Sequence, residues 1–322
     1  MAARLAAIAD GVGRGDVAVL AKTHEDVDAR VAFLRAAGLD ASYATQNLGA
    51  QRRQGRGGSI RPSLVGLARA RNNRCDAGRG AAMRAVRLYE DGLRLDEIAR
   101  PEPADGEVLV RVHAAAITRD ELTWPTDRLP AIPSYELSGV VEATGEEVMA
   151  LTPFDRDGVA AEYAVMPKTV LAPKPAALSH VEAAALPMGG LSTWQGLVVH
   201  GGLKTGERVC VTGATGGVGH LAVQLARALG ATVVAEGEAC DLLFDTAGRA
   251  DGDAKRIVTI ANEAPGATYF IVEPNGEQLA QLGALGLRPE VDSTFALSDF
   301  EAAFARSEAR GKHGKVVLQI HG

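Results

Sequence analysis

One stretch, residues 208–236, constrains the fold more than any other part of the chain. It begins with a short β-branched run at 208–212 and continues through a turn with glycines at 213, 216, 217 and 219. Leu221, Leu225 and Leu229 then repeat at helical spacing until Gly230, which can end a helix. Residues 232–235 are apolar over the length of a second strand. The stretch therefore predicts a strand, a glycine turn, a helix and a strand.

The glycine turn predicts a binding site for a dinucleotide. Glycines let the backbone approach a pyrophosphate because they lack a Cβ, and the free N–H groups at a helix start favour negative charge. We expect the phosphates to contact the turn and the first helical residue, namely Gly213, Gly216, Gly217, Val218 and Gly219. The spacing departs from the standard G-x-G-x-x-G, so a plain strand-turn-helix corner is the alternative.

The composition indicates a globular chain without a membrane domain. Its 322 residues are enough for two ordinary domains, and 47% of them are hydrophobic. No apolar run approaches the roughly 20 residues that span a bilayer. The three cysteines, Cys75, Cys210 and Cys240, lack metal-ligand spacing, which favours a reduced protein in the cytoplasm.

The charge is distributed unevenly between two parts of the chain. Residues 1–82 carry 13 Lys and Arg against 7 Asp and Glu, so the net charge of −6 leaves −12 for residues 83–322. Residues 48–82 are rich in Gly and Arg, which predicts a disordered basic linker. The linker could hold nucleic acid by counterion release, but it has no aromatic residue after Gln51 to stack on bases. Nucleic-acid binding is therefore the less favoured interpretation.

The rest of the chain predicts three further regions. A strand, a helix and a strand over residues 16–46 indicate a small α/β extension. From residue 83, short apolar or alternating runs separated by Gly and Pro predict a partly closed antiparallel barrel. These runs are 84–89, 93–98, 107–114, 137–143, 159–166 and 170–171. Residues 181–186 and 190–199 then change to helical periodicity and lead into the glycine turn.

Several motifs occur in a family-specific order along residues 83–322. They are Pro133-Ser-Tyr-Glu-Leu-Ser-Gly-Val-Val141, Ala160-Ala-Glu-Tyr-Ala164, Ala183-Ala-Ala-Leu-Pro187, Leu191-Ser-Thr-Trp-Gln-Gly196 and the glycine turn. Together they resemble the medium-chain dehydrogenase/reductase superfamily, and within it the zinc-independent quinone oxidoreductase-like branch. The resemblance implies an α/β fold with a GroES-like, partly open β-barrel, a Rossmann domain and a tail that returns to the barrel.

With the resemblance, the sequence predicts five regions. They are an extension at 1–47, a linker at 48–82, a GroES-like catalytic domain at 83–180, a Rossmann domain at 181–285 and the tail at 286–322.

The expected zinc ligands are replaced in this chain. Zinc-containing members hold the metal with a Cys early in the barrel and with a His-Glu pair. The matching positions here are Ile117-Thr118-Arg119-Asp120 and Tyr135-Glu136. Thiolate and imidazole are both missing, so we expect no metal site. Alcohol oxidation then lacks a Lewis acid, whereas reduction of a quinone or an activated alkene remains feasible.

The resemblance also implies which residues touch substrate and cofactor. Tyr135 stands at the place of a zinc-ligating His and could present its hydroxyl to the substrate, although a core tyrosine is an equal alternative. Thr118 stands where similar reductases often have Asn, or it is a turn residue. The remaining cofactor contacts implied by the resemblance are Ser192, Thr193, Thr246, Phe270 and Val272.

Glu236 leaves the choice of cofactor contradictory. It ends the second strand, where a carboxylate would accept hydrogen bonds from a ribose 2′-hydroxyl and repel a 2′-phosphate. The branch that the chain resembles mostly suggests NADP. We expect NADP, with NAD as the alternative.

Two connections in the Rossmann domain are short. Only residues 236–241 separate the second strand from the apolar run 242–244, and residues 249–255 separate that run from a strand at 256–260. Because a parallel crossover needs about a dozen residues, the second strand and the run at 242–244 are not expected to be parallel members of one sheet in the usual way. The sequence therefore predicts a truncated Rossmann domain.

Three functional interpretations remain open from the sequence. The first is a zinc-independent NAD(P)H-dependent reductase of a quinone, enone or similar activated alkene or carbonyl, forming a homodimer through the edges of its Rossmann sheets. The second is a shortened and inactive remnant of such an enzyme. The third is a nucleotide-responsive protein that binds RNA through its basic linker.

Overall fold

The computed structural model describes residues 81–124, 126 and 128–321. The chain divides into two compact units, 1–74 and 75–322, and the described residues belong to the second. The predicted α/β extension and nearly all of the predicted basic linker lie outside the described residues. Within those residues, no helix has the length and apolar character needed to cross a membrane.

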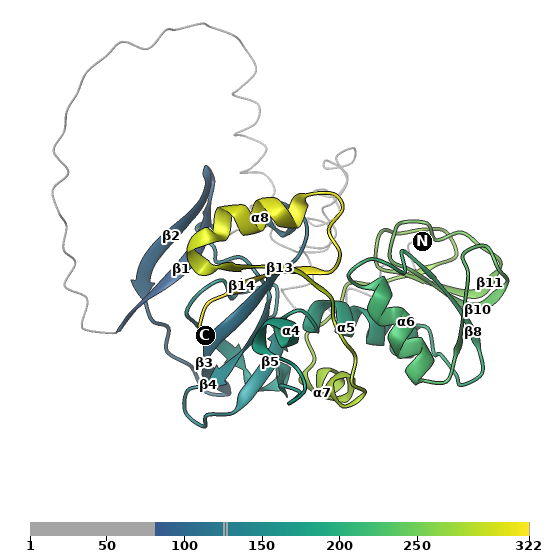
Figure 1. The fold of residues 1–322 in the computed structure, drawn as a ribbon, viewed down its shortest axis with the longest axis horizontal. Coiled ribbons are helices and arrows are strands. Elements are labelled where there is room, and N and C mark those ends of the chain that lie inside the picture. Colours follow the sequence, from purple (N-terminus) through teal and green to yellow (C-terminus); the bar gives the residue numbers. More distant parts are fainter. Residues whose placement is uncertain (1–80, 125, 127, 322) are drawn as a thin grey trace, which may run out of the picture. The chain divides into compact units, whose positions relative to one another are not determined.

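The described part begins with a β-hairpin that is tied to the barrel. β1 (Ala82–Tyr89) and β2 (Gly92–Ala99) pair antiparallel around Gly92, whose φ of 131° suits glycine. Isolated bridges join Ala85 to Ala161 and Leu88 to Ala131. Both strands confirm the sequence prediction, and the bridges from β1 tie the hairpin to the loops that precede β4 and β6 (Figure 1).

A seven-stranded sheet forms the barrel around the long strand β3. Its members are β3 (Glu107–Ile117), β4 (Glu136–Val141), β5 (Glu147–Leu151), β6 (Tyr163–Pro167), β7 (Leu171–Pro173), β13 (Val291–Ala296) and β14 (Lys315–Gln319). The order is β13-β14-β3-β4-β5-β7, and β6 also pairs with β3. Sequence analysis missed β5 because Val148 to Leu151 are all buried, so the run lacks alternation.

The C-terminal segment joins this barrel sheet. β14 pairs antiparallel with β3, and β13 lies parallel to β14. Helix α8 (Phe300–Glu308) connects them and packs Phe300 and Phe304 into the barrel core. Three short 3₁₀ helices, η2 (Glu121–Thr123), η3 (Lys168–Val170) and η5 (Leu297–Asp299), shape the connections. The barrel is therefore completed by residues far apart in sequence.

A second sheet contains five parallel strands. They are β8 (Arg208–Thr212), β9 (Thr232–Val234), β10 (Cys240–Asp245), β11 (Ala254–Thr259) and β12 (Thr268–Tyr269), in the order β12-β11-β10-β8-β9. Helix α6 (Gly219–Ala228) joins β8 to β9, and Gly230 follows it with a φ of 80°. The strand, glycine turn, helix and strand predicted from the sequence are confirmed.

The expectation for the first short connection was wrong. β9 and β10 both run parallel to β8, on its two sides, so they are members of one parallel sheet. Val234 of β9 lies opposite Cys210 of β8. Cys240 of β10 lies about three residues closer to the start of β8. The link must therefore cover about 14 Å, given strand spacings of about 4.8 Å, and six Cα–Cα steps reach about 20 Å. A connection between parallel strands needs about a dozen residues when it contains a helix, but an extended link can be shorter.

The second short connection works in the same way. β10 and β11 are parallel neighbours, with Cys240 opposite Ala254 and Asp245 opposite Thr259. Residues 246–253 return across the sheet without a helix or strand. They pass close to Leu243, since a Cβ on Gly252 would lie 3.0 Å from the Leu243 Cδ1. The shortened domain thus keeps the strand order of its sheet.

Four helical segments complete the described fold. α4 (His180–Ala184), α5 (Pro187–Trp194) and the π-helical η4 (Gln195–His200) precede β8, and α7 (Gly276–Ala284) follows β12. Leu221 of α6 and Leu191 of α5 share one core cluster with Val209, Leu242 and Phe244 of the sheet. A barrel and a Rossmann-like parallel sheet are both present, which confirms the predicted fold class. The predicted domain limits remain predictions.

Candidate functional site

The glycine turn leaves β8 in a conformation that only glycine adopts easily. Gly213 has a φ of 69°, and a Cβ on Gly219 would lie 2.0 Å from the Gly213 carbonyl oxygen. By contrast, a Cβ on Gly217 would meet nothing within 4 Å, and Gly216 is exposed. Gly213 and Gly219 therefore build the turn, whereas Gly216 and Gly217 offer open backbone at the start of α6.

Two side chains hold the turn from outside. The imidazole of His220 donates from Nδ1 to the Gly216 carbonyl at 2.9 Å, because its Nε2 accepts the Glu290 N–H at 3.1 Å. The hydroxyl of Thr193 donates to the Val218 carbonyl at 3.3 Å. The position of the turn is thus set by α5 and by the segment before β13, as well as by its own glycines.

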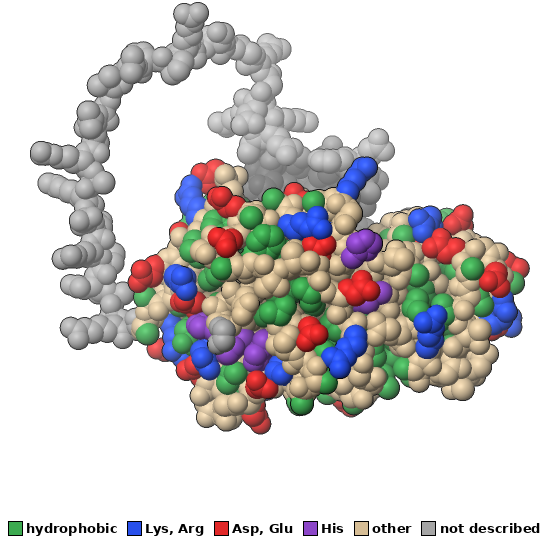
Figure 2. All heavy atoms as spheres, viewed as in Figure 1, with side chains coloured by type: hydrophobic (Ala, Val, Ile, Leu, Met, Phe, Trp, Pro, Cys, Tyr) green, Lys and Arg blue, Asp and Glu red, His purple; other side chains and the backbone are tan. Residues whose placement is uncertain are grey.

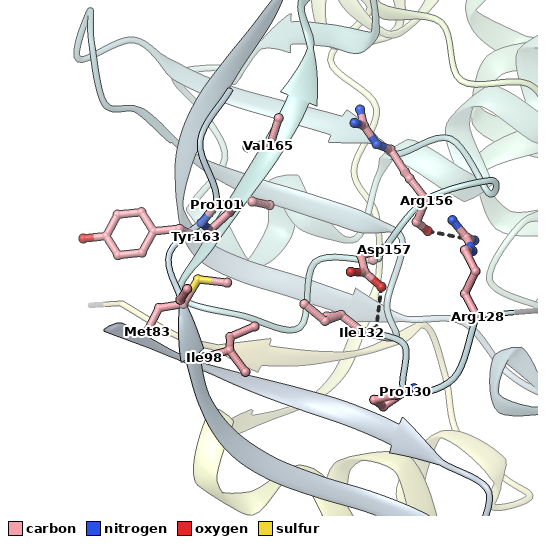
Figure 3. Close-up of a pocket in the computed structure, with 13 residues that line it drawn as sticks. Met83, Ile98, Pro101, Arg128, Pro130, Ile132, Arg156, Asp157, Tyr163 and Val165 are labelled. Atoms are coloured by element: carbon pink, nitrogen blue, oxygen red, sulfur yellow. Dashed lines mark hydrogen bonds between the residues drawn. The ribbon is translucent and has the colours of Figure 1, made fainter. Parts of the chain in front are cut away.

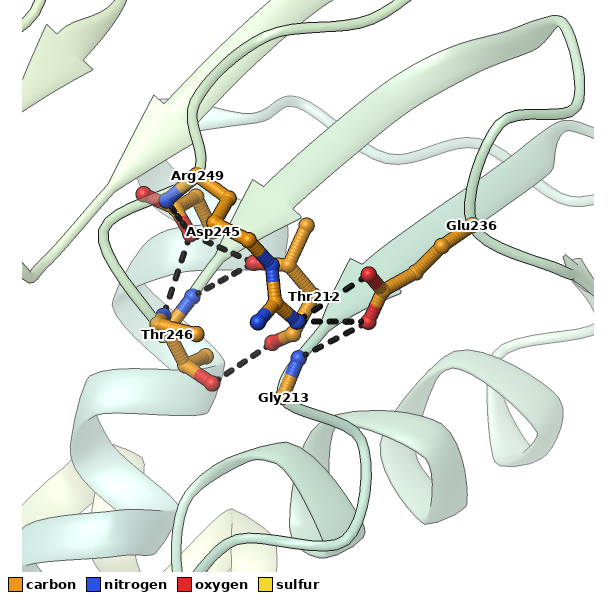
Figure 4. Close-up of polar contacts among 7 residues, drawn as sticks. Thr212, Gly213, Glu236, Asp245, Thr246 and Arg249 are labelled. Atoms are coloured by element: carbon orange, nitrogen blue, oxygen red, sulfur yellow. Dashed lines mark hydrogen bonds and ion pairs between the residues drawn. The ribbon is translucent and has the colours of Figure 1, made fainter.

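A buried carboxylate organises the carboxyl ends of the parallel strands (Figure 4). Asp245 is fully buried and accepts hydrogen bonds from the hydroxyls of Thr212 and Thr259 and from the backbone N–H groups of Ala247 and Arg249. Burial alone would raise the pKa of Asp245, but these hydrogen bonds together lower it. The carboxylate stays charged and fixes the start of the link after β10.

Thr246 lies against the glycine turn, and its contact with a cofactor remains a prediction. Its hydroxyl donates to the Thr212 carbonyl at 2.7 Å, and its N–H donates to the Thr212 hydroxyl at 3.2 Å. A Cβ on Gly213 would come within 2.8 Å of the Thr246 Oγ1. The side chain of Thr246 therefore packs against the backbone of Gly213, and only a glycine at position 213 leaves room for this contact.

Glu236 lies at the same edge and is paired with Arg249. The Glu236 Oε1 accepts the Gly213 N–H at 3.2 Å, and Arg249 Nη2 lies 3.0 Å from both carboxylate oxygens. Both side chains remain about half exposed. Sequence analysis missed Arg249 because it belongs to the link after β10, and only the parallel register brings that link beside the end of β9.

The remaining predicted cofactor residues are largely buried. Ser192 and Thr193 are 4% and 0% exposed, and Phe270 and Val272 are 8% and 9% exposed. The amide of Gln195 both donates to and accepts from the backbone of Glu273, at 2.8 and 2.9 Å. This pairing fixes the segment after β12 to η4, while the side chains of Phe270 and Val272 stay buried.

Helix α5 connects the glycine turn with the barrel. At its first turn the N–H of Met188 donates to Glu136 Oε2 at 2.8 Å. A Cβ on Gly189 would lie 3.1 Å from the Gly217 carbonyl oxygen, so the helix and the turn are in close contact. The two halves of the candidate site are therefore linked through one short helix.

On the barrel side, Tyr135 lies in a group of aromatic rings. Its ring stacks on Trp124 with centroids 5.5 Å apart and meets Phe154 edge-on at 5.4 Å. The rings border a space of about 30 Å³. Within the described residues, the Tyr135 hydroxyl has no hydrogen-bond partner. Burial, followed by the nearby Glu121, raises the pKa of Tyr135, so the phenol keeps its proton at neutral pH.

Glu121 lies buried beside this aromatic group. Its Oε2 accepts the Thr118 N–H at 2.9 Å, and its Oε1 accepts the Ser134 N–H at 3.0 Å and the Ser134 hydroxyl at 3.3 Å. Burial raises the pKa of Glu121 to about 7, against the lowering effect of the backbone hydrogen bonds. Nothing in the sequence pattern distinguished Glu121 from a surface glutamate.

The hydroxyl of Thr118 contacts both members of the ion pair between Lys315 and Glu136. Lys315 Nζ lies 2.5 Å from Glu136 Oε1 and donates to the Thr118 hydroxyl at 2.9 Å. The Thr118 hydroxyl in turn donates to Glu136 at 3.3 Å. Lys315 is 12% exposed and Glu136 is 0% exposed. The structure thus places Thr118 and Tyr135 on one side of the barrel, but it engages the Thr118 hydroxyl in this pair.

A larger cavity lies between the hairpin and the barrel (Figure 3). It has a volume of about 500 Å³ and is lined by apolar residues such as Met83, Ile98 and Ile132. Its two arginines are already engaged, since Arg128 donates to the carbonyls of residues 154–156 and Arg156 pairs with Glu107 at 2.6 Å. None of the predicted site residues lines this cavity.

His113 of β3 stacks on His180 and lies tilted beside His321. The rings of His113 and His180 are 4.3 Å apart, and those of His113 and His321 are 5.9 Å apart. Histidine side chains are visible together on the surface drawn in Figure 2. Burial, followed by His180, lowers the pKa of His113 to about 4, so this ring is neutral at physiological pH. Among the described residues, no group of His, Cys, Asp and Glu side chains is arranged to hold a metal ion.

Comparison with known proteins assigns the family. Residues 104–176 match the alcohol dehydrogenase GroES-like domain. A quinone-oxidoreductase homolog of chloroplasts from Spinacia oleracea is 30% identical over 246 residues, which cover 64% of this chain and 74% of the relative. A probable zinc-binding oxidoreductase of mitochondria from Arthroderma benhamiae is 28% identical over 303 residues, covering 69% and 92%.

A solved structure agrees with these relatives. The quinone oxidoreductase from Thermus thermophilus, also determined in complex with NADPH, is 30% identical. It superposes with a TM-score of 0.63 and covers 74% of this chain and 100% of its own. The chain belongs to the medium-chain dehydrogenase/reductase superfamily, in its quinone oxidoreductase-like branch. Membership confirms the resemblance stated from the sequence. The site residues of this medium-chain reductase remain predictions.

The ion pair between Lys315 and Glu136 leads to a prediction about stability. In Lys315→Met, Glu136 keeps a buried negative charge without its cation, and we expect a loss of about 3–5 kcal/mol in unfolding free energy. Urea denaturation measures this loss. Lys255→Met is the matched control, because Lys255 is 79% exposed in its pair with Asp241 and should contribute little. A Lys315→Met protein as stable as wild type would contradict the prediction.

Glu121 generates a pH prediction. Its pKa is about 7 in the folded protein and 4.5 as the reference value, so the folded state binds this proton more tightly. Its contribution to stability is therefore complete below pH 4.5 and is lost as the pH rises through 7. The loss is on the order of 3 kcal/mol. Unfolding free energy measured from pH 4.5 to 8 should show this slope in wild type and lose it in Glu121→Gln.

The control for this measurement is Glu182→Gln. Glu182 caps α4, and hydrogen bonds from Ser179 lower the pKa of its carboxyl group. Because the pKa of Glu182 is lowered, this group titrates below the measured range, and Glu182→Gln should leave the slope between pH 4.5 and 8 nearly unchanged. An unchanged slope in Glu121→Gln would show that Glu121 is ionised throughout this range.

Proposed function

We propose that this medium-chain reductase transfers a hydride from NADPH to a quinone, an enone or a similar activated alkene or carbonyl, without zinc. The observation that carries the proposal is the open backbone at Gly217, where the glycine turn enters α6 and a Cβ would meet nothing within 4 Å. Such a turn leaves room for a pyrophosphate and directs N–H groups toward it. The complex of the related Thermus thermophilus quinone oxidoreductase with NADPH supports the choice of cofactor.

The chain supplies binding and proton chemistry in this proposal. The nicotinamide supplies the hydride when it is bound. Tyr135 presents a phenol that keeps its proton and has no partner among the described residues, so it can donate to the oxygen on which the substrate's charge develops. Glu121, with a pKa of about 7, lies near Tyr135 and influences the phenol's pKa. Trp124 and Phe154 provide flat apolar surfaces that suit a conjugated substrate.

The donor set of the barrel does not fit a catalytic zinc. The two positions that carry the thiolate and the imidazole in zinc-containing members are occupied here by the Ile117-Asp120 segment and by Tyr135. Both oxygens of the remaining Glu136 are engaged, one by Lys315 and the other by the Met188 N–H. A lysine ammonium beside this carboxylate repels a divalent cation. We therefore derive no step through a metal.

The substrate enters by separating aromatic rings. The space beside Tyr135 is about 30 Å³, whereas sites for small molecules usually measure about 300–1,000 Å³. Trp124 is joined to the barrel by η2, a single 3₁₀ turn that precedes it. Movement of this residue away from Tyr135 would open the cleft without breaking a sheet.

The proposal includes a homodimer that pairs the edges of the parallel sheets. β12 ends the sheet and has β11 as its described neighbour. Apolar side chains are unusually exposed around it, with Ile271 65%, Val199 54% and Tyr269 38% exposed. A short strand with free backbone groups and apolar neighbours is a template for pairing with another strand. A second copy of this chain provides a matching edge.

Tyr135→Phe tests the role of the phenol. We expect the variant to bind NADPH as wild type does, and its kcat with a small quinone or enone to fall about 100-fold, because a positioned acid commonly contributes that much. Coenzyme fluorescence measures binding, and loss of NADPH absorbance measures turnover. Tyr89→Phe is the control, since Tyr89 lies on the hairpin and donates to Asp96. Equal turnover in both variants would remove Tyr135 from the mechanism.

Thermal unfolding of the wild-type protein tests the proposed function. NADPH should raise the midpoint of thermal unfolding, because a ligand that binds the native state stabilises it by mass action. A well-folded protein whose melting temperature is unchanged by NADPH and NADH would support the inactive remnant instead.

Ile271→Arg tests the proposed dimer edge. A charge at this exposed position should shift the protein from dimer to monomer in sedimentation velocity at micromolar concentration, with its melting curve retained. Leu285→Arg is the control, because Leu285 is also exposed, at 39%, but follows α7 away from β12. A wild-type protein that sediments as a monomer would overturn the dimer.

A further inference from the structure

We propose that Arg249 recognises the 2′-phosphate of NADPH and that Glu236 aims its guanidinium. The inference rests on the proposed function and adds the residues that decide between NADPH and NADH. It assigns this role to the link after β10, in which the sequence predicted only Thr246 as a cofactor contact.

The position of the pair matches the place of the adenosine ribose. In dinucleotide-binding sheets, an acidic residue at the end of the second strand lies beside the ribose, and a nearby arginine accommodates a 2′-phosphate. Glu236 follows β9 and accepts the N–H of Gly213, the first residue of the glycine turn, at 3.2 Å. Arg249 reaches the same carboxylate from the other side of β8 (Figure 4). Both residues therefore border the expected ribose.

The backbone of Arg249 is fixed by a hydrogen bond, whereas its guanidinium group is partly exposed to solvent. Its N–H donates to the buried Asp245 carboxylate at 2.9 Å, and that carboxylate is held in turn by Thr212 and Thr259. The side chain is 56% exposed, and only Nη2 contacts Glu236. Within the described residues, Nε and Nη1 have no partner. A guanidinium with two free donors can bind a phosphate while its third group remains paired.

The pair also explains how a phosphate can be tolerated next to Glu236. An isolated carboxylate would repel the 2′-phosphate. Here the guanidinium contacts both carboxylate oxygens at 3.0 Å, which offsets the charge of Glu236. Glu236 then orients the arginine instead of accepting the ribose hydroxyl. The glutamate that favoured NAD in the sequence becomes compatible with NADP in the folded chain.

The short link makes this arrangement possible. Residues 246–253 leave β10 at the carboxyl edge and return without a helix, and Arg249 is only four residues beyond Asp245. A helix at this position would direct the chain away from the turn within a few residues. The shortened connection therefore keeps a cationic side chain beside the glycine turn.

Titration of the full chain with four ligands tests the inference. NADPH and 2′,5′-ADP carry the 2′-phosphate, whereas NADH and 5′-ADP lack it, and the two ADP isomers report on the subsite without hydride chemistry. In Arg249→Ala, we expect the Kd values for NADPH and 2′,5′-ADP to rise about 10- to 100-fold, as for a lost hydrogen bond to a charged group. The Kd values for NADH and 5′-ADP should stay within about twofold.

Arg208→Ala is the matched control. Arg208 also pairs with a half-exposed glutamate, Glu238, at 3.0 Å, but it lies at the opposite end of β8. Its loss should leave all four Kd values unchanged. Arg249→Lys serves as a second variant that keeps the charge and should retain part of the preference for NADPH. Glu236→Gln should keep NADPH binding within about threefold, because the arginine rather than the carboxylate meets the phosphate.

The outcomes separate the two proposals. Loss of affinity confined to the 2′-phosphorylated ligands in Arg249→Ala supports the inference. Equal losses for all four ligands, or no loss, would overturn it while leaving the reductase function in place. A folded wild-type protein that binds neither NADPH nor NADH would overturn both proposals.

Discussion

The buried carboxylate of Asp245 is the interaction on which the coenzyme side of this protein depends. It lies at the carboxyl end of the central strand and receives four hydrogen bonds, from the side chains of Thr212 and Thr259 and from two N–H groups of the link. Because a buried charge is costly unless it is paired or hydrogen-bonded, these donors must stay in place. Two neighbouring strands and the link are thereby held in register beside the glycine turn.

Helix α5 connects the glycine turn to the barrel. Met188 in its first turn donates to Glu136, and Gly189 and Thr193 contact the glycine turn. Glu136 in turn pairs with Lys315 from the last strand of the barrel. A coenzyme at the turn and a substrate beside Tyr135 would therefore meet across one short helix. Glu136 thus serves as a buried anion that joins the start of α5 to β14.

The shortened sheet shows which parts of a dinucleotide-binding domain are needed for its strand order. The links at 235–239 and 246–253 have no helix, yet all five strands remain parallel. Extended chain covers the distance between strand ends with few residues, so the helical layer can be lost while the pairing is kept. The second link also places Arg249 next to Glu236, where its guanidinium offsets the charge of the carboxylate.

The sequence by itself determined most of the local elements, the glycine turn, the helix that stops before Gly230 and the family resemblance. These features depend on periodicity and on conformations that few residues adopt, and both are visible in neighbouring positions. Only the tertiary structure decided that the strands at 232–234 and 240–245 are parallel. It also decided that Lys315 and Glu121 lie buried beside Thr118, and that Arg249 pairs with Glu236. Such contacts join residues distant in sequence, so they arise from strand register and packing rather than from any local pattern.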